Sequence, residues 1–158
     1  MSSRVVVTAL GLVLLCACGS KPEPETAAPP PPPRAMPKPV DESARFPKKD
    51  LIEVKLVEGH VLDKGLLPGG NVGYYRNARR SYQLFLVRTP SSESAAILLN
   101  DFKASLAVFQ YVPTFGGFYG MDGANPVFIF QKGVYLAGVV GLTREEADQV
   151  AREFAARL

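Results

Sequence analysis

The stretch that decides the fold is Val127-Phe-Ile-Phe-Gln-Lys-Gly-Val-Tyr-Leu-Ala-Gly-Val-Val140. It contains two apolar runs, 127–130 and 134–140, of the length and composition typical of strands. Lys132-Gly133 lies between them and predicts a two-residue hairpin connection. An antiparallel pair of strands is therefore expected near the end of the chain.

The segment after this hairpin is typical of an amphipathic helix. Thr143-Arg-Glu-Glu146 fits a capping box, in which the first and last side chains satisfy free backbone N–H groups. The residues that follow form one continuous apolar face: Ala147, Val150, Ala151, Phe154, Ala155 and Leu158. Such a face has to pack on another layer, and the sheet is the available one.

Upstream residues repeat the combination of strands and a helix. Residues 52–56 alternate apolar and polar side chains, as in a half-buried strand, and 82–87 are apolar enough for a central strand. Tyr74-Tyr75-Arg76 is its expected hairpin partner. Thr89-Pro90 is predicted to begin a helix, and an extended pattern resumes at 108–111. The apolar stripe of that helix comprises Ala95, Leu98, Leu99, Phe102 and Leu106.

These elements predict an α+β fold in a single domain that spans residues 47–158. We expect a mostly antiparallel sheet of five or six strands with both helices on one face. The span is long enough for one hydrophobic core and too short for two.

The first 17 residues are predicted to be a signal peptide. Arg4 supplies a positive charge, and Val5–Leu15 is an apolar run with the length of a secretory core and too short to span a bilayer as a helix. The domain is therefore expected to be exported. Both cysteines lie in or next to this leader, so an internal disulfide and a thiolate metal site are excluded for the domain.

The end of the leader, Leu15-Cys-Ala-Cys18-Gly19, resembles the lipobox of bacterial lipoproteins. The resemblance implies cleavage before Cys18, a diacylglycerol on its sulfur and acylation of its amine, with fatty acids such as palmitate. Several acyl chains make a stable membrane anchor. Gly19 after the cysteine implies the outer membrane, facing the periplasm, in a diderm host. The alternative is an ordinary signal peptide cleaved near Ala17, which leaves Cys18 as a thiol.

Residues 18–46 are predicted to be a disordered, proline-rich linker. Five consecutive prolines, Pro29–Pro33, fix the backbone near polyproline II and remove the N–H groups that a sheet needs. At about 3.1 Å per residue such a segment is an effective spacer. The alternative is a docking ligand for an aromatic groove, since Pro30 and Pro33 fit a PxxP pattern.

Composition provides little support for enzyme chemistry. The net charge is only +3, so the protein lacks the strongly positive potential that indicates a nucleic-acid partner. His60 is the only histidine, whereas a metal site needs three or four ligands and a catalytic base needs a nucleophile beside it. We therefore expect no catalytic residue, no metal and no cofactor, and a solvent-facing His60 at the end of a strand.

Two short stretches are candidate binding surfaces. Residues 74–82 hold Tyr74, Tyr75, Arg76, Arg79 and Arg80, which together suit an anionic lipid, a wall carboxylate or an acidic protein. The alternative is a solvated hairpin turn that keeps a sheet edge soluble.

The second stretch, Phe115-Gly-Gly-Phe-Tyr-Gly120, offers Phe115, Phe118 and Tyr119 as an apolar lip that could grip a ligand or a protein. The alternative is a bent or bulged strand in which the glycines relieve crowding.

The stretch from Tyr82 to Leu158 resembles a group of small, uncharacterised bacterial lipoprotein domains. Its shared features are Tyr82-x-Leu-Phe-Leu-Val, Tyr111-Val-Pro-x-Phe-Gly-Gly-Phe-Tyr-Gly and the 127–142 hairpin. The resemblance implies the fold and the location and carries no catalytic residue. We expect an envelope lipoprotein with a non-enzymatic binding or scaffolding domain. Its partners would be the membrane, through the anchor, and an envelope protein, wall or anionic lipid component. The alternative is a carrier or sensor of a small apolar ligand, and a hydrolase is the least favoured.

Overall fold

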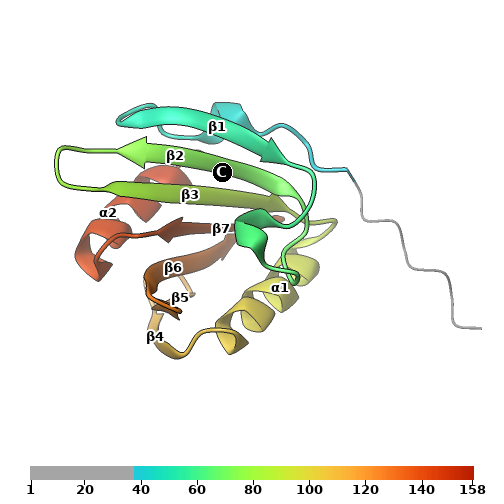
Figure 1. Ribbon diagram of the computed structural model, residues 1–158. Coiled ribbons are helices and arrows are strands. Elements are labelled where there is room, and N and C mark those ends of the chain that lie inside the picture. The colour runs from blue at the N-terminus through green and yellow to red at the C-terminus, as the bar shows by residue number, and fades with distance from the viewer. Residues whose placement is uncertain (1–37) are drawn as a thin grey trace, which may run out of the picture. The chain divides into compact units, whose positions relative to one another are not determined.

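The computed structural model describes residues 38–158, which form one antiparallel sheet and two helices (Figure 1). The spatial order of the strands is β1-β2-β3-β7-β6-β5-β4. The strands are β1 (Leu51–Val57), β2 (Gly70–Arg76), β3 (Ser81–Arg88), β4 (Val108–Val112), β5 (Gly117–Asp122), β6 (Asn125–Lys132) and β7 (Tyr135–Val140). The helices are α1 (Ser92–Ala104) and α2 (Arg144–Ala155), with short 3₁₀ turns η1 (Ser43–Arg45) and η2 (Val61–Asp63).

The α+β prediction is confirmed, but the sheet has seven strands rather than five or six. The difference arises at the glycine-rich stretch that begins at Phe115. It contributes a full strand, β5, which pairs with β4 on one side and with β6 on the other. Gly117 and Gly120 permit this close pairing, because a Cβ at either position would meet a neighbouring strand's backbone oxygen within 2.4 Å.

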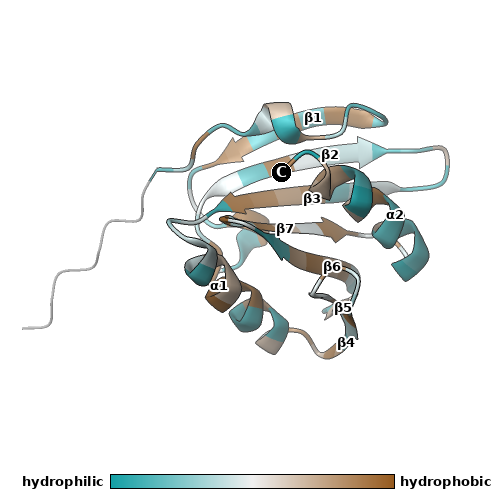
Figure 2. Cartoon of the chain, turned by 180° about the vertical axis from the view of Figure 1, so that it is seen from behind, coloured by the Kyte–Doolittle hydropathy of each residue, from teal (hydrophilic) through white to brown (hydrophobic). Residues whose placement is uncertain are grey.

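The prediction that both helices share one face is wrong. Along β6, Val127 and Ile129 join the core beneath α1, whereas Phe128 and Phe130 join the core beneath α2. Since alternate residues of a strand point to opposite faces, the helices cover opposite sides of the sheet (Figures 1 and 2). The physical reason is that β3, β6 and β7 are apolar on both faces, so each face has to be shielded from water.

The two helix starts differ in how well the sequence predicted them. The capping box of α2 is confirmed, since the Thr143 backbone N–H donates to the Glu146 carboxylate over 3.2 Å. Helix α1, however, is capped by Ser91 and not by Thr89. The Thr89 hydroxyl is instead 2.8 Å from the Val134 backbone oxygen, so Thr89 belongs to the junction between β3 and the β6–β7 turn.

Strand β1 forms one edge of the sheet and departs from the expected alternation. A bulge interrupts its pairing with β2 between Leu51 and Glu53. Leu51 and Val54 therefore both pack on the α2 side of the core, while Ile52 is left 58% exposed at the bulge.

The ordered domain begins before residue 47, so the predicted linker boundary at residue 46 is wrong. Phe46 is fully buried, and its ring lies 5.1 Å from that of Phe154 in α2. The side-chain amide of Asn71 donates to the Val40 backbone oxygen over 2.8 Å and accepts from the Glu42 N–H over 3.2 Å. Residues 40–46, hereafter the clasp, are thus fixed against the sheet.

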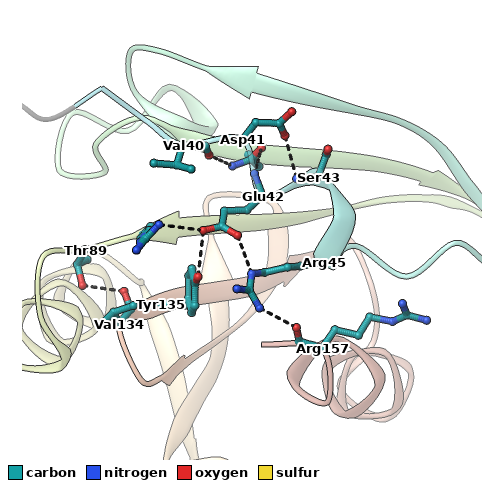
Figure 3. Close-up of polar contacts among 11 residues, drawn as sticks. Val40, Asp41, Glu42, Ser43, Arg45, Thr89, Val134, Tyr135 and Arg157 are labelled. Carbon is teal, nitrogen blue, oxygen red and sulfur yellow. Dashed lines mark hydrogen bonds and ion pairs between the residues drawn. The ribbon is translucent and has the colours of Figure 1, made fainter.

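Glu42 is the centre of the clasp (Figure 3). Its carboxylate accepts hydrogen bonds from Arg45 over 2.6 Å and from Tyr135 over 3.0 Å, and it lies 3.4 Å from the Arg88 guanidinium. Arg45 also donates to the backbone oxygen of Arg157 after α2. Burial alone would raise the pKa of Glu42, but the Arg45 and Tyr135 hydrogen bonds and the two arginine charges outweigh it and hold the pKa below its ordinary value.

The predicted signal peptide, the lipidated Cys18 and the run of prolines all lie outside the described residues. Within residues 38–158, no helix is long and apolar enough to cross a membrane.

Candidate functional site

A polar row crosses the α1 face of the sheet at the end that α1 leaves uncovered. Strand pairing places Glu53, Tyr74, Gln83 and Val140 side by side across β1, β2, β3 and β7. At the other end of the same face, the buried side chains of α1 pack on the sheet. The uncovered end forms an open groove of about 630 Å³, hereafter the row groove. Its lining consists of Ile52, Glu53, Leu62, Asp63, Tyr74, Tyr75, Arg76, Ser81, Tyr82, Gln83, Asp122, Asn125, Val140 and Gly141.

One wall of the row groove is a loop with an unfavourable backbone conformation. Leu62 and Asp63 have φ angles of 56° and 55°, in the left-handed region that residues other than glycine seldom adopt. The loop is held by Lys64, whose ammonium lies 2.8 Å from the Asp122 carboxylate and 5.2 Å from the Phe102 ring centre. Strain that surrounding contacts maintain is typical of binding sites.

The charges of the row groove are only partly neutralised within the described residues. Glu53 pairs with Lys55 over 3.0 Å, and Asp122 pairs with Lys64. For Asp63 and Arg76 the described part of the chain provides no ion pair; Arg76 donates a long hydrogen bond of 3.4 Å to the Ser81 hydroxyl. The groove therefore offers a carboxylate and a guanidinium to a ligand, together with the amides of Gln83 and Asn125 and the ring of Tyr74.

Of the predicted arginine–tyrosine surface, Tyr74 and Arg76 contribute to the row groove, but Tyr75 has a different role. Its side chain is 1% exposed on the opposite face, where it stacks on Tyr82 at 5.0 Å and donates to the Pro47 backbone oxygen. Burial raises the pKa of both phenols, that of Tyr82 to about 12. Although both residues reach the groove lining, both rings lie in the core, and Tyr75 joins β2 to Pro47.

Arg79 and Arg80 belong to the exposed turn between β2 and β3. The Asn77 side-chain oxygen accepts the N–H groups of both residues over 2.9 Å, which fixes the turn. Arg80 lies 3.4 Å from the Glu146 carboxylate of α2, and Arg79 borders a second groove of about 480 Å³ on the α2 face. The three arginines are therefore divided between the two faces.

The predicted lip of Phe115, Phe118 and Tyr119 does not form, because these side chains also lie on opposite faces. Phe115 packs on the Phe128 ring at 5.2 Å, and the Tyr119 hydroxyl donates to the Leu142 backbone oxygen, both on the α2 side. Phe118 points to the α1 side. Strand geometry explains the split for Phe118 and Tyr119, since neighbouring strand residues alternate faces.

His60 is exposed, and its Nδ1 atom lies 2.9 Å from the Leu67 backbone oxygen. Across residues 38–158 no cluster of three or more His, Cys, Asp or Glu side chains could hold a metal ion.

Sequence reasoning missed Asp63, Gln83 and Asn125 as members of the groove. They come from three separate segments, the η2 turn, β3 and the start of β6, which only the fold brings together.

Comparison with known proteins identifies no family for this chain. No protein-family model matches it, and no curated protein matches it. A solved structure from Thermotoga maritima, described as a GTP binding regulator, matches with a TM-score of 0.54 and 13% sequence identity, over 73% of this chain and 82% of the other. At this identity the likeness shows a shared fold alone.

Proposed function

We propose that the protein is a lipid-anchored lipoprotein of the bacterial envelope whose domain binds a polar envelope component in the row groove, without catalysis. The lipobox-like sequence at Cys18 and the run of prolines support the anchor and the spacer. The observation that carries the binding role is the uncovered row groove, which holds Asp63 and Arg76, two charges with no ion pair among residues 38–158.

The chemistry of the row groove favours a ligand with charges of both signs. Arg76 suits a carboxylate, Asp63 suits an amine, and Gln83 and Asn125 can exchange hydrogen bonds with amides or hydroxyls. A volume of about 630 Å³ lies in the usual range for small-ligand sites. Peptides of the bacterial wall combine amine, carboxylate and amide groups, so they are the ligand class that we propose.

The start of the clasp and the row groove lie at opposite ends of β2. Asn71 contacts the clasp, while Arg76 borders the groove, and five residue steps separate them. At about 3.3 Å per step the separation is about 17 Å. No residue of the clasp is among those that line the row groove.

A carrier of an apolar ligand and a hydrolase have less support in the structure. The space between sheet and helices, where a carrier would hold an apolar ligand, is filled by side chains such as Phe85 and Phe102, whose rings meet edge to face at 5.8 Å. For a hydrolase, His60 would need a serine or a carboxylate beside it, and its ring contacts a backbone oxygen instead.

Binding of wall peptides tests the proposed function. In an NMR titration with soluble peptides released from cell wall, we expect shifts at Tyr74, Gln83 and Asn125. Arg76→Ala should weaken binding about tenfold or more, since a charge-assisted hydrogen bond contributes about 1.5–3 kcal/mol. Asp63→Asn should weaken it similarly, because it removes the carboxylate that suits the peptide's amine.

Lys48→Ala is the matched control, because it removes an exposed positive charge that lies outside the lining of the row groove. GTP, titrated in parallel, is expected to leave the groove signals unchanged. Equal affinity in the Arg76→Ala variant, or shifts that map to another surface, would contradict wall-peptide binding in the groove.

A further inference from the structure

The edge of the sheet at β4 is open and apolar. Within the described residues β4 pairs only with β5. Val108, Phe109 and Tyr111 are 69%, 48% and 53% exposed. A strand with one unpaired side presents N–H and C=O groups that can pair with another chain.

The two edges of the sheet differ in how they resist such pairing. Strand β1 has a bulge beside Ile52 and carries the Glu53–Lys55 ion pair, both of which discourage the addition of a strand. Strand β4, Val108-Phe-Gln-Tyr-Val112, contains no charged residue and no proline, and its pairing with β5 shows no register shift. Only β4 therefore has the features of an edge open to a partner.

The sequence of β4 indicates what the partner is. It reads valine, aromatic, glutamine, aromatic, valine, so it has the same chemistry in both directions. We propose that β4 pairs antiparallel with β4 of a second copy of this chain, around a two-fold axis at Gln110. This register places Val108 opposite Val112, Phe109 opposite Tyr111, and Gln110 opposite itself, and no side chain of β4 carries a charge.

The side chains on either face of β4 are arranged for this pairing. Phe109 and Tyr111 lie on the α1 side, where their ring centres are 5.8 and 5.5 Å from that of Phe118. In the dimer the two sets of rings extend one aromatic cluster across the axis. Gln110 lies at the proposed axis, and its side-chain oxygen accepts a hydrogen bond from Arg144 over 2.7 Å. This bond fixes the orientation of the Gln110 side chain.

The expected dimer is weak in dilute solution. A half-exposed aromatic side chain offers about 100 Å² for burial, so Phe109 and Tyr111 of the two copies supply about 400 Å² in total. This is well below the about 1,200 Å² of stable interfaces. Confinement to a membrane raises the effective concentration and favours the dimer. The pairing itself does not depend on the proposed anchor, and only its strengthening at the membrane does.

Cysteine cross-linking tests the pairing and its register. In the full chain, in its own membranes, Gln110→Cys treated with a short bismaleimide is expected to give a product of twice the chain's mass. A mixture of Phe109→Cys and Tyr111→Cys chains should also give a dimer, and Phe109→Cys alone much less. Ile52→Cys on β1 is the matched control for the opposite edge, and the unaltered chain controls for Cys16 and Cys18.

Adding Tyr111→Lys to Gln110→Cys should lower the dimer yield at least tenfold, because it places a charge on the paired edge. The Cys18→Ala chain, tested in solution at high concentration, should still cross-link through Gln110→Cys, which separates failure of the pairing from failure of the anchor. A Gln110→Cys product of any other mass, no dimer in either setting, or an equal yield from Ile52→Cys would overturn the inference.

Discussion

Phe46→Ala is expected to lower the free energy of unfolding by about 3–5 kcal/mol, the usual cost of removing a fully buried phenylalanine. Phe46 is 0% exposed, and its ring packs on Phe154 and against Gly73, where an added Cβ would lie 2.6 Å from the Phe46 ring. The loss would open a cavity between the clasp, β2 and α2. Urea denaturation of the two proteins measures the difference directly.

Phe109→Ala provides the matched control, since Phe109 is a half-exposed phenylalanine at the sheet edge. We expect it to change stability by less than about 1 kcal/mol. A chain that begins at residue 47 should behave like Phe46→Ala or worse, because it lacks the whole clasp. If either change left the unfolding midpoint where it is, Phe46 would not be part of the core.

Glu42→Gln is expected to lower the free energy of unfolding by about 2 kcal/mol at neutral pH, in line with the 1.5–3 kcal/mol of hydrogen bonds to a charged group. The substitution removes the charge that Arg45 and Arg88 face, and it weakens the bond from Tyr135. Because the pKa of Glu42 is depressed in the folded protein, its stabilising contribution is present above its ordinary value of 4.5. That contribution is lost as the pH falls through the lower, folded value.

The difference between the original protein and Glu42→Gln should therefore shrink as the pH is lowered below about 4.5. Urea denaturation at neutral pH and at about pH 3 measures it. Glu58→Gln is the control, because Glu58 is an exposed carboxylate after β1. A stability difference that stays constant from neutral to acid pH would show that the Glu42 charge does not hold the clasp.

The sequence predicted those elements whose signals are local. The β6–β7 hairpin follows from the apolar runs of 127–140, and the start of α2 from the capping box at Thr143. Each signal depends on residues within a few positions of one another. The prediction that both helices lie on one face was wrong, although the sequence contained a signal against it. Val127-Phe-Ile-Phe130 is apolar on both faces of the strand, so both faces of the sheet need a covering layer.

The clasp and the row groove were beyond sequence reasoning for a different reason. Residues 38–46 show no strand or helix period, so nothing in that segment announces that Phe46 enters the core or that Glu42 meets Tyr135, which is 93 positions away. The groove unites Tyr74, Gln83 and Val140, which are spaced irregularly along the chain and meet only through strand register. The sequence predicted Tyr74 and Arg76 as binding residues because of their chemistry. It could not predict that Gln83 and Val140 lie beside Tyr74.

The central claim is that a domain with a binding groove is held at a membrane through Cys18, and intact mass of the protein from the membrane fraction tests it most directly. We expect a mass that matches a chain beginning at Cys18 plus acyl chains, and an unacylated, membrane-free product from a Cys18→Ala variant. A membrane-free, unmodified product from the original sequence would contradict the anchor and leave the domain as a secreted binding protein.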